Sequence, residues 1–367
     1  MLDLEIRLMN TAIERATTGF HHISMRVGDL EGTTHFWSRL LGLTIWSAEG
    51  VAEGPGRSDG EGSASAEGPR TVLLADAQGS PGSMVELVEE TSGRRGHWGV
   101  GGIHHVALGT RDEGTQLMWK RWLSDRGVPV SGPYDRGYFR SIYFRDPEGH
   151  VVEIATAGPG YGYDEPMDRL GESFIGADDH GERMRGSRDE RAIHMETHPD
   201  PISAISPEMS LQGIHHITGI TDDMDRADAF YRDVLGLSLV KRTVNQDDGE
   251  ARHFFWARYD GTDVAPRSSM TLFDWPGSGY RARSGQGATR HVAFRAGDLA
   301  ELEGWWEHLE ALGLQPHGPV DRGFTHTLTV EAPDGLTVVL ATDEPGIAAD
   351  EPGIASDNAA TNLDGYS

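Results

Sequence analysis

Four segments of the chain open with the same alternation of apolar and polar residues, and each carries a histidine at a matching position. The segments are FHHISMRV at 20–27, IHHVAL at 103–108, IHHITGI at 214–220 and RHVAF at 290–294. The aligned histidines are His22, His105, His216 and His291. Alternation with a period of two predicts half-buried β-strands. The recurrence predicts four repeats of one structural element, which we number units one to four in chain order.

Each opening strand is followed by a helical pattern that ends at a glycine. Asp29 can cap the helix of unit one, and Asp222 or Asp223 can cap the helix of unit three. The glycines that end the four patterns are Gly42, Gly127, Gly236 and Gly313. A helix C-cap favours the left-handed backbone conformation that glycine adopts most readily. The pattern therefore predicts one helix in each unit.

Apolar runs separated by turn signals follow each helix. Unit two has SIYF at 141–144, DPEG at 146–149 and VVEI at 151–154, and unit four has THTLTV at 325–330, APDG at 332–335 and LTVVL at 336–340. Unit one ends in MVELV at 84–88 and unit three in MTLF at 270–273. These signals predict strands. The unit is therefore βαβββ, an α+β arrangement that buries one helix against a curved sheet.

The repeats divide the chain into two halves with a connection between them. Residues 1–157 hold units one and two (about 20–90 and 101–157), and residues 211–342 hold units three and four (about 211–275 and 288–342). Three stretches fall outside the pattern. They are predicted to be a solvated loop at 49–70, a linker at 158–210 with few apolar residues, and a disordered tail at 343–367.

The composition limits the classes of partner. Asp and Glu number 58 against 32 Lys and Arg, which gives a net charge of −26, and two of those cations are lysines, Lys120 and Lys241. A surface this acidic repels phosphate backbones and anionic lipids, so we expect no nucleic-acid or membrane partner. An acidic, lysine-poor composition resembles that of halophilic proteins; an acidic protein from a high-GC organism is the alternative.

The same composition bears on redox chemistry and location. The chain has no cysteine, which excludes disulfides, thiolate nucleophiles and cysteine-ligated metal sites. No run approaches the roughly 18 apolar residues of a membrane span. The first ten residues, MLDLEIRLMN, lack the apolar core of a signal peptide. We therefore expect a cytoplasmic protein.

The histidines of the opening strands and Glu153 on a closing strand form a candidate metal site. Imidazole and carboxylate groups are good ligands for a divalent metal of intermediate softness. Glu153 lies between Val152 and Ile154, where a buried carboxylate needs a metal or a strong partner. The alternatives are an edge-strand glutamate that faces water and histidines that are ordinary core residues.

These residues carry a resemblance to the vicinal-oxygen-chelate superfamily, which includes glyoxalase I, fosfomycin-resistance proteins and extradiol ring-cleaving dioxygenases. The chain most resembles the hydroquinone-type ring-cleaving dioxygenases. Segments 213–220 and 234–248 (VLGLSLVKRTVNQDD) are similar to the amino-terminal opening of that family, and segments 135–147 (DRGYFRSIYFRDP) and 152–161 (VEIATAGPGY) to its carboxy-terminal end. The resemblance covers units two to four well and unit one weakly. It implies four βαβββ modules that form two curved mixed-sheet barrels or cups.

The order of these segments departs from the family. The half that usually comes last comes first here, as in a circular permutation, and residues 158–210 join what would otherwise be the termini. In the family, the metal lies between the modules that correspond to units two and three. The resemblance therefore implies His105, Glu153 and His216 as ligands. Such a 2-His-1-carboxylate triad is typical of Fe(II), with Mn(II) as the alternative.

The resemblance also implies a set of substrate residues. They are His104, His215, Thr218, Arg136 and Tyr143. The implied partners are O2 and a small aromatic substrate, which is cleaved next to a hydroxyl group. Tyr143 and Arg136 would stabilise anionic oxygen, and a histidine would move a proton. A period of two places His104 and His105 on opposite faces, so both reach one cavity only if the strand bends or ends there. Tyr138 and Phe139 are candidates for lining the cavity.

Other functions stay open at this point. A glyoxalase-like lyase or isomerase would use the metal as a Lewis acid, but such sites usually hold four protein ligands, and unit three offers Leu272 or Phe273 near the position of Glu153. A metal-free binding or resistance protein would need no such triad. The triad positions recur in units one and four as His22, Glu86 and His291, a candidate second metal site. The oligomeric state is open, a homo-oligomer included.

Overall fold

The structure is a computed structural model that describes residues 15–49, 69–176 and 189–346. Most of the predicted loop at 49–70 and of the predicted tail at 343–367 therefore lies outside the described residues. The last strand runs to Pro345, three residues into the stretch that was predicted to be disordered.

Four consecutive parts of the chain have the same order of elements: a strand, a helix and three strands. Unit one contains β1 (Phe20–Val27), α2 (Leu30–His35), the π-helical turn η1 (Phe36–Leu40), β2 (Thr44–Glu49), β3 (Thr71–Ala75) and β4 (Met84–Glu89). Unit two contains β5 (Ile103–Thr110), α3 (Glu113–Ser124), β6 (Ser131–Asp135), β7 (Arg140–Arg145) and β8 (Val151–Thr156). Unit three contains β10 (Ile214–Thr221), α6 (Met224–Ala229), η5 (Phe230–Val234), β11 (Ser238–Asn245), β12 (Asp248–Ala257) and β13 (Ser269–Asp274). Unit four contains β14 (Thr289–Gly297), α7 (Leu299–Ala311), β15 (His317–Asp321), β16 (Thr325–Glu331) and β17 (Thr337–Pro345). The predicted α+β class is confirmed.

The helices of units one and three begin at predicted caps, and each of the four units has the predicted glycine after its helix. In every unit an aspartate side chain accepts a backbone N–H three residues along the chain, and the four caps are Asp29, Asp112, Asp223 and Asp298. Of the two candidates in unit three, Asp223 is therefore the cap. The glycines that follow the helices have positive φ, at 78°, 79°, 68° and 79° for Gly42, Gly127, Gly236 and Gly313.

The strands form two mixed sheets, and each sheet takes one unit from each half of the chain. The strand order is β15-β16-β17-β14-β1-β4-β3-β2 in one sheet and β6-β7-β8-β5-β10-β13-β12-β11-β9 in the other. Unit one therefore joins unit four through the antiparallel pair β1–β14, and unit two joins unit three through the antiparallel pair β5–β10.

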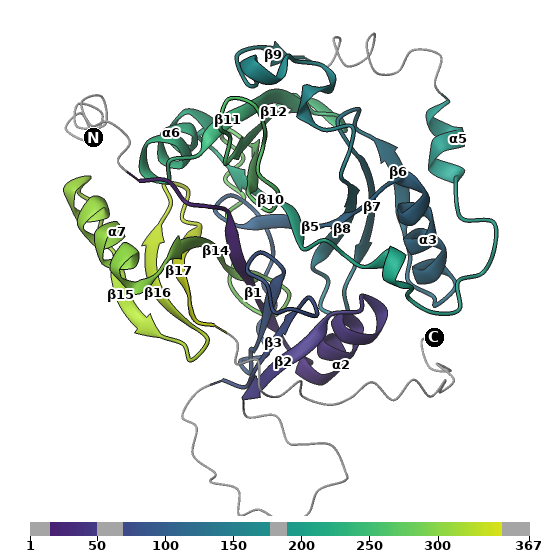
Figure 1. Cartoon of the computed structure of the whole chain (residues 1–367), viewed down its shortest axis with the longest axis horizontal. Coiled ribbons are helices and arrows are strands. Elements are labelled where there is room, and N and C mark those ends of the chain that lie inside the picture. The colour runs from purple at the N-terminus through teal and green to yellow at the C-terminus, as the bar shows by residue number, and fades with distance from the viewer. Residues whose placement is uncertain (1–14, 50–68, 177–188, 347–367) are drawn as a thin grey trace, which may run out of the picture.

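The helices pack on the outer faces of the curved sheets, with α3 beside one sheet and α7 beside the other (Figure 1). Large aromatic side chains anchor them, among them Trp37, Trp119 and Trp305, which are all buried. Two tryptophans also connect units one and two. Trp37 of unit one donates a hydrogen bond to the Asp146 side chain of unit two, and Trp122 of unit two donates one to the Leu40 carbonyl of unit one. This packing leaves the inner faces of the sheets free for polar side chains.

The connection between the halves carries short elements that the sequence did not predict. They are η2 (Tyr161–Tyr163), η3 (Met167–Arg169), β9 (Phe174–Ile175), α5 (Glu190–Met195) and η4 (Pro207–Met209). Strand β9 pairs in parallel with β11 and so extends the sheet of units two and three. Within the described residues, no helix combines the length and the apolar character needed to cross a bilayer.

Candidate metal centre and its cavity

Strand register brings His105, His216 and Glu153 to one face at the junction of units two and three. Ala107 on β5 lies opposite His216 on β10 and also pairs with Glu153 on β8. His105 precedes Ala107 by two residues and therefore points to the same face. The small, fully buried side chain of Ala107 leaves room for the larger groups around it.

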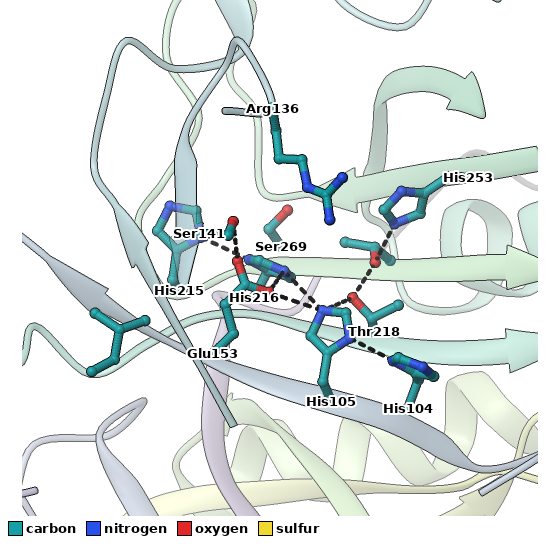
Figure 2. A network of polar contacts seen from close by, with 12 residues as sticks. His104, His105, Arg136, Ser141, Glu153, His215, His216, Thr218, His253 and Ser269 are labelled. Carbon is teal, nitrogen blue, oxygen red and sulfur yellow. Dashed lines mark hydrogen bonds and ion pairs between the residues drawn. The ribbon is translucent and has the colours of Figure 1, made fainter. Parts of the chain in front are cut away.

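The three side chains converge through single atoms, as Figure 2 shows. Glu153 Oε2 lies 3.1 Å from His105 Nε2 and 3.3 Å from His216 Nε2, and the two Nε2 atoms are 3.3 Å apart. All three residues are buried. We call this group the first triad. Its ligand atoms lie within 4.8 Å of one another, a spacing that could hold a metal ion.

Glu153 is an anion that lacks a full set of donors. Ser141 donates a hydrogen bond to Oε1 at 2.6 Å, but Oε2 has no donor of acceptable geometry among the described residues. Burial alone would raise the pKa of the Glu153 carboxyl, yet the facing rings of His216 and His105 hold it well below the usual value. A buried, ionised oxygen aimed at two imidazole nitrogens fits a cation site.

β-bulges displace the residues that precede the ligand histidines. On β5, Ile103 and His105 pair with the consecutive residues Gly219 and Thr218, so His104 is an extra residue in the ladder. His215 is the extra residue on β10. A bulge of this kind turns a side chain away from strict alternation. His104 therefore lines the same cavity as His105, which meets the condition stated for these two residues.

Each of these preceding histidines contacts the next ring through Nδ1. The distances between Nδ1 atoms are 2.8 Å for His104 and His105 and 2.9 Å for His215 and His216. Burial lowers the pKa of both His104 and His215 to about 3, so both are neutral at neutral pH. His215 does not line the cavity of the first triad; it faces a neighbouring cavity of about 540 Å³.

Arg136 and Tyr143 both line the cavity of the first triad. Tyr143 on β7 pairs with Glu153, and its ring centroid lies 5.7 Å from that of His105. Burial and the nearby Glu153 carboxylate raise the pKa of the Tyr143 hydroxyl, so it stays protonated. Arg136 contacts Gln246 at 3.3 Å and Asp247 at 3.2 Å, which ties unit two to the β11–β12 turn.

Thr218 is buried beside the first triad. Its hydroxyl is 2.8 Å from His105 Nε2 and 2.7 Å from the Thr271 hydroxyl. Thr271 pairs with Thr218 just as Glu153 pairs with Ala107. The residue equivalent to Glu153 in unit three is therefore Thr271. The assignment of Leu272 or Phe273 to that position was wrong by one or two residues, because the closing strand begins one residue earlier than the sequence pattern indicated.

The cavity beside the first triad measures about 380 Å³ and is lined largely by rings. These include Tyr134, Tyr138, Phe139, Tyr143, Phe273 and Trp275. The lining role expected for Tyr138 and Phe139 agrees with their position. The sequence analysis missed Ser141, which holds Glu153, and His253 on β12, whose Nε2 lies 2.9 Å from the Thr271 hydroxyl. Ser141 stands within the signature segment 135–147, where only Arg136 and Tyr143 were assigned substrate roles, whereas His253 lies outside every quoted motif.

The model of the Glyoxalase/Bleomycin resistance protein/Dioxygenase superfamily matches residues 19–154 and 213–340, which together cover most of the chain. Each matched region contains two of the four units.

Curated relatives align with parts of the chain. "Putative ring-cleaving dioxygenase MhqA" of Bacillus subtilis is 34% identical over 156 residues, which is 42% of this chain and 45% of that protein. The chlorohydroquinone/hydroquinone 1,2-dioxygenase of Sphingobium indicum is 30% identical over 131 residues, 35% of this chain and 38% of that protein. Both alignments span less than half of the relative.

Solved structures share the fold over nearly the whole chain. A crystal structure described as a putative dioxygenase from Bacillus subtilis has a TM-score of 0.66 at 19% sequence identity. The alignment covers 92% of this chain and 89% of the Bacillus subtilis chain. Glyoxalase I from Zea mays has a TM-score of 0.54 at 18% identity and covers 89% of this chain and 92% of its own. At these identities the likeness shows the fold alone.

Proposed function

Because the chain belongs to the Glyoxalase/Bleomycin resistance protein/Dioxygenase superfamily, we propose that it is an extradiol-type dioxygenase that cleaves a hydroquinone or related phenol next to a hydroxyl group. The observation that carries the proposal is a buried triad of two histidines and one glutamate beside a cavity lined by aromatic side chains. The names of the two curated relatives support it. A small aromatic substrate, O2 as co-substrate and a cytoplasmic location are parts of the same proposal.

The first triad fits Fe(II). His105 and His216 would bind through Nε2, and Glu153 through the oxygen that has no donor among the described residues. Two imidazoles and one carboxylate leave coordination positions free for substrate and O2. When bound, iron supplies the redox chemistry of O2 and lowers the pKa of the substrate hydroxyl. Mn(II) suits the same donors.

The adjacent histidines would fix the orientation of the ligand rings. With Nε2 used for the metal, the proton of His105 sits on Nδ1 and is donated to His104 Nδ1 at 2.8 Å. His215 would orient His216 in the same way. His104 then keeps its own proton on Nε2, and because His104 lines the cavity, this N–H could donate to the substrate. The Thr218 hydroxyl lies 2.8 Å from His105 Nε2, the atom assigned to the metal, so Thr218 would stand beside the metal position rather than hold the ring.

Tyr143 and Arg136 would act on the substrate rather than on the metal. Tyr143 is a protonated phenol beside the first triad, so it can donate to oxygen that becomes negative during the reaction. Arg136 is held by Gln246 and Asp247 and presents a permanent positive charge to the same cavity. The surrounding rings would exclude water and stack on an aromatic substrate.

Three ligands separate this proposal from a glyoxalase-like isomerase. Thr271 stands at the position where unit two has Glu153, so the first triad has no second carboxylate. A site with three protein ligands keeps more positions open than a site with four. That count favours binding of both substrate and O2.

The test is oxygen uptake by anaerobically purified protein loaded with Fe(II) or Mn(II), with a panel of substituted hydroquinones. We expect O2 and substrate to be consumed in equal amounts, with a ring-opened product, by wild type and not by His216→Ala. Conversion of a glutathione hemithioacetal without oxygen uptake would instead identify an isomerase. Tight hydroquinone binding by metal-free protein without turnover would identify a binding protein.

A further inference from the structure

A second group of metal-ligand side chains lies in the other sheet. His22 on β1, Glu86 on β4 and His291 on β14 are buried, and their ligand atoms lie within 4.8 Å of one another. The Nε2 atoms of His22 and His291 are 2.9 Å apart. We call this group the second triad. It lies at the β1–β14 junction, near the centre of the sheet of units one and four (Figure 1).

The second triad is built by the same register as the first, with the carboxylate on the other side of the junction. Ser24 pairs with both His291 and Glu86, as Thr218 pairs with both His105 and Thr271. Glu86 therefore occupies the position of Thr271. In unit four, Val339 pairs with Ala293 and so occupies the position of Glu153. Each junction thus carries two histidines and one carboxylate.

The second triad is held in place as the first one is. His21 is the extra residue of a bulge on β1, and its Nδ1 lies 2.8 Å from His22 Nδ1. This contact leaves His22 Nε2 directed at His291. The Ser24 hydroxyl donates to Glu86 Oε2. Both the histidine and the carboxylate are therefore oriented by a neighbour before any ion binds.

The surroundings of the two triads differ in charge. The cavity of the second triad is smaller, about 180 Å³, and three arginines line it: Arg26, Arg290 and Arg322. Arg290 Nη1 lies 3.7 Å from Glu86, and Arg26 pairs with Glu90 at 3.3 Å. Threonines rather than tyrosines make up much of the remaining wall. The positive charges of the three guanidinium groups therefore outnumber the two nearby carboxylates, Glu86 and Glu90, before a metal is added.

A divalent ion would add to this excess of positive charge. The excess disfavours a bare ion but favours an ion that binds together with an anion, since each charge is then compensated at short range. Guanidinium groups are well suited to oxyanions because they donate paired hydrogen bonds. The cavity is too small and too polar to resemble the aromatic cavity of the first triad.

We propose that the second triad is a second divalent-metal site, and that Arg26, Arg290 and Arg322 bind a small doubly charged oxyanion at its open coordination positions. This site is separate from the proposed dioxygenase centre, because its residues come from units one and four and line a different cavity. The chain then carries one metal centre in each sheet, one for an aromatic ligand and one for an anion.

Metal stoichiometry tests the first part. After anaerobic loading with Mn(II) and gel filtration, we expect two equivalents per chain in wild type and one in each of His291→Ala, Glu86→Gln and His216→Ala. The combination of His291→Ala with His216→Ala should bind none, and His35→Ala, which changes an exposed histidine, should bind two. One equivalent in wild type that His291→Ala retains would overturn the second site and leave the first intact. Two equivalents in folded His291→Ala and Glu86→Gln would also overturn it.

Anion binding tests the second part. In Mn(II)-loaded His216→Ala protein, we expect only the second triad to hold metal. This protein is titrated with orthophosphate or sulfate, and binding at the second triad is followed by calorimetry and by the Mn(II) electron paramagnetic resonance spectrum. We expect binding that weakens by at least about tenfold in Arg322→Gln, because a charge-assisted pair of hydrogen bonds is lost. Arg94→Gln, at an exposed arginine, is the matched control. Equal affinity in Arg322→Gln, or no spectral change with either anion, would overturn the anion site.

Discussion

Each ligand histidine of the first triad follows another histidine, and the pair touches through Nδ1. Because a bulge places His104 and His215 outside strict alternation, each can reach the ring of its neighbour. The resemblance treats these two residues as substrate residues. Their contacts favour a role as positioning residues for His105 and His216, and of the two only His104 also lines the cavity beside the first triad.

At the scale of single ligands, we predict that His105→Ala, His216→Ala and Glu153→Ala each lose about one equivalent of bound iron per chain relative to wild type. Each change removes one of three protein ligands, and metal affinity depends on all of them. Elemental analysis of protein purified without oxygen measures the iron, and circular dichroism confirms the fold. His35→Ala is the control at an exposed site. Iron at the wild-type level in any of the three variants would remove that residue from the first triad.

The residues proposed to face the substrate carry a different prediction. Tyr143→Phe should keep iron and fold but lose turnover by roughly 10²–10³-fold, because a preorganised donor to developing negative charge is lost. Arg136→Lys should also be slower, since an ammonium group cannot reproduce the planar guanidinium contacts with Gln246 and Asp247. Oxygen uptake by iron-loaded protein measures both, with the exposed Tyr163→Phe as control. Wild-type turnover in Tyr143→Phe would make its hydroxyl incidental.

At the scale of elements, the sequence predicted those features that depend only on the residues within one strand or helix. Alternating residues identified the opening strands, and aspartate and glycine identified the helix ends, so the α+β class followed. A bulge depends on how a strand registers with its partner, and the pattern of one strand does not contain that information. The displacement of His215 by a bulge and the pairing of Thr271 with Thr218 therefore could not be predicted from the sequence. The same holds for His253, whose role arises from contact with Thr271.

The connection between the halves gives a prediction about stability. Lys241 on β11 is fully buried and contacts Asp164 at 2.5 Å and Glu165 at 3.3 Å. Lys241→Met should lower the free energy of unfolding by about 3–5 kcal/mol, because two buried carboxylates lose their cation. Urea denaturation measures the change. Adding Asp164→Asn and Glu165→Gln should restore most of the loss, whereas a near-neutral Lys241→Met would show that the connection is held by other contacts.

The turn between β16 and β17 gives a prediction about pH. Burial raises the pKa of Asp334 to about 6, and the Asp222 charge adds to the shift. The unfolded chain titrates near 3.8, so the stabilising effect of the protonated side chain is present at low pH and is lost as pH rises through about 6. Asp334→Asn should therefore match wild type near pH 4 and exceed it at pH 8 by about 2–3 kcal/mol. Unfolding free energies at the two pH values provide the check, and an equal difference at both would refute the shift.

At the scale of the whole molecule, the two sheets explain why the triads occur in pairs of units. Each sheet joins a unit from the first half to a unit from the second half through their opening strands. The histidines on those strands therefore meet at the junction, whichever unit supplies the carboxylate. The order of the units along the chain did not reveal this pairing. Only the resemblance indicated that units two and three meet, and the strand order agrees.

Net charge is a property of the whole chain, and it leads to the last prediction. At −26 the folded protein repels itself, and salt screens that repulsion because the Debye length falls from about 10 Å at 0.1 M to about 3 Å at 1 M. The melting temperature at pH 7.5 should therefore rise between 0.1 and 1 M NaCl. The chain supplies its own control, since near pH 5, close to the isoelectric point of about 4.9, the net charge is small and the same salt range should change the melting temperature little. The prediction fails if the melting temperature at pH 7.5 is flat or falls with salt, or if it changes equally with salt at both pH values. Either result would mean that self-repulsion does not limit the stability of this fold, and that the acidic composition reflects something other than adaptation to salt.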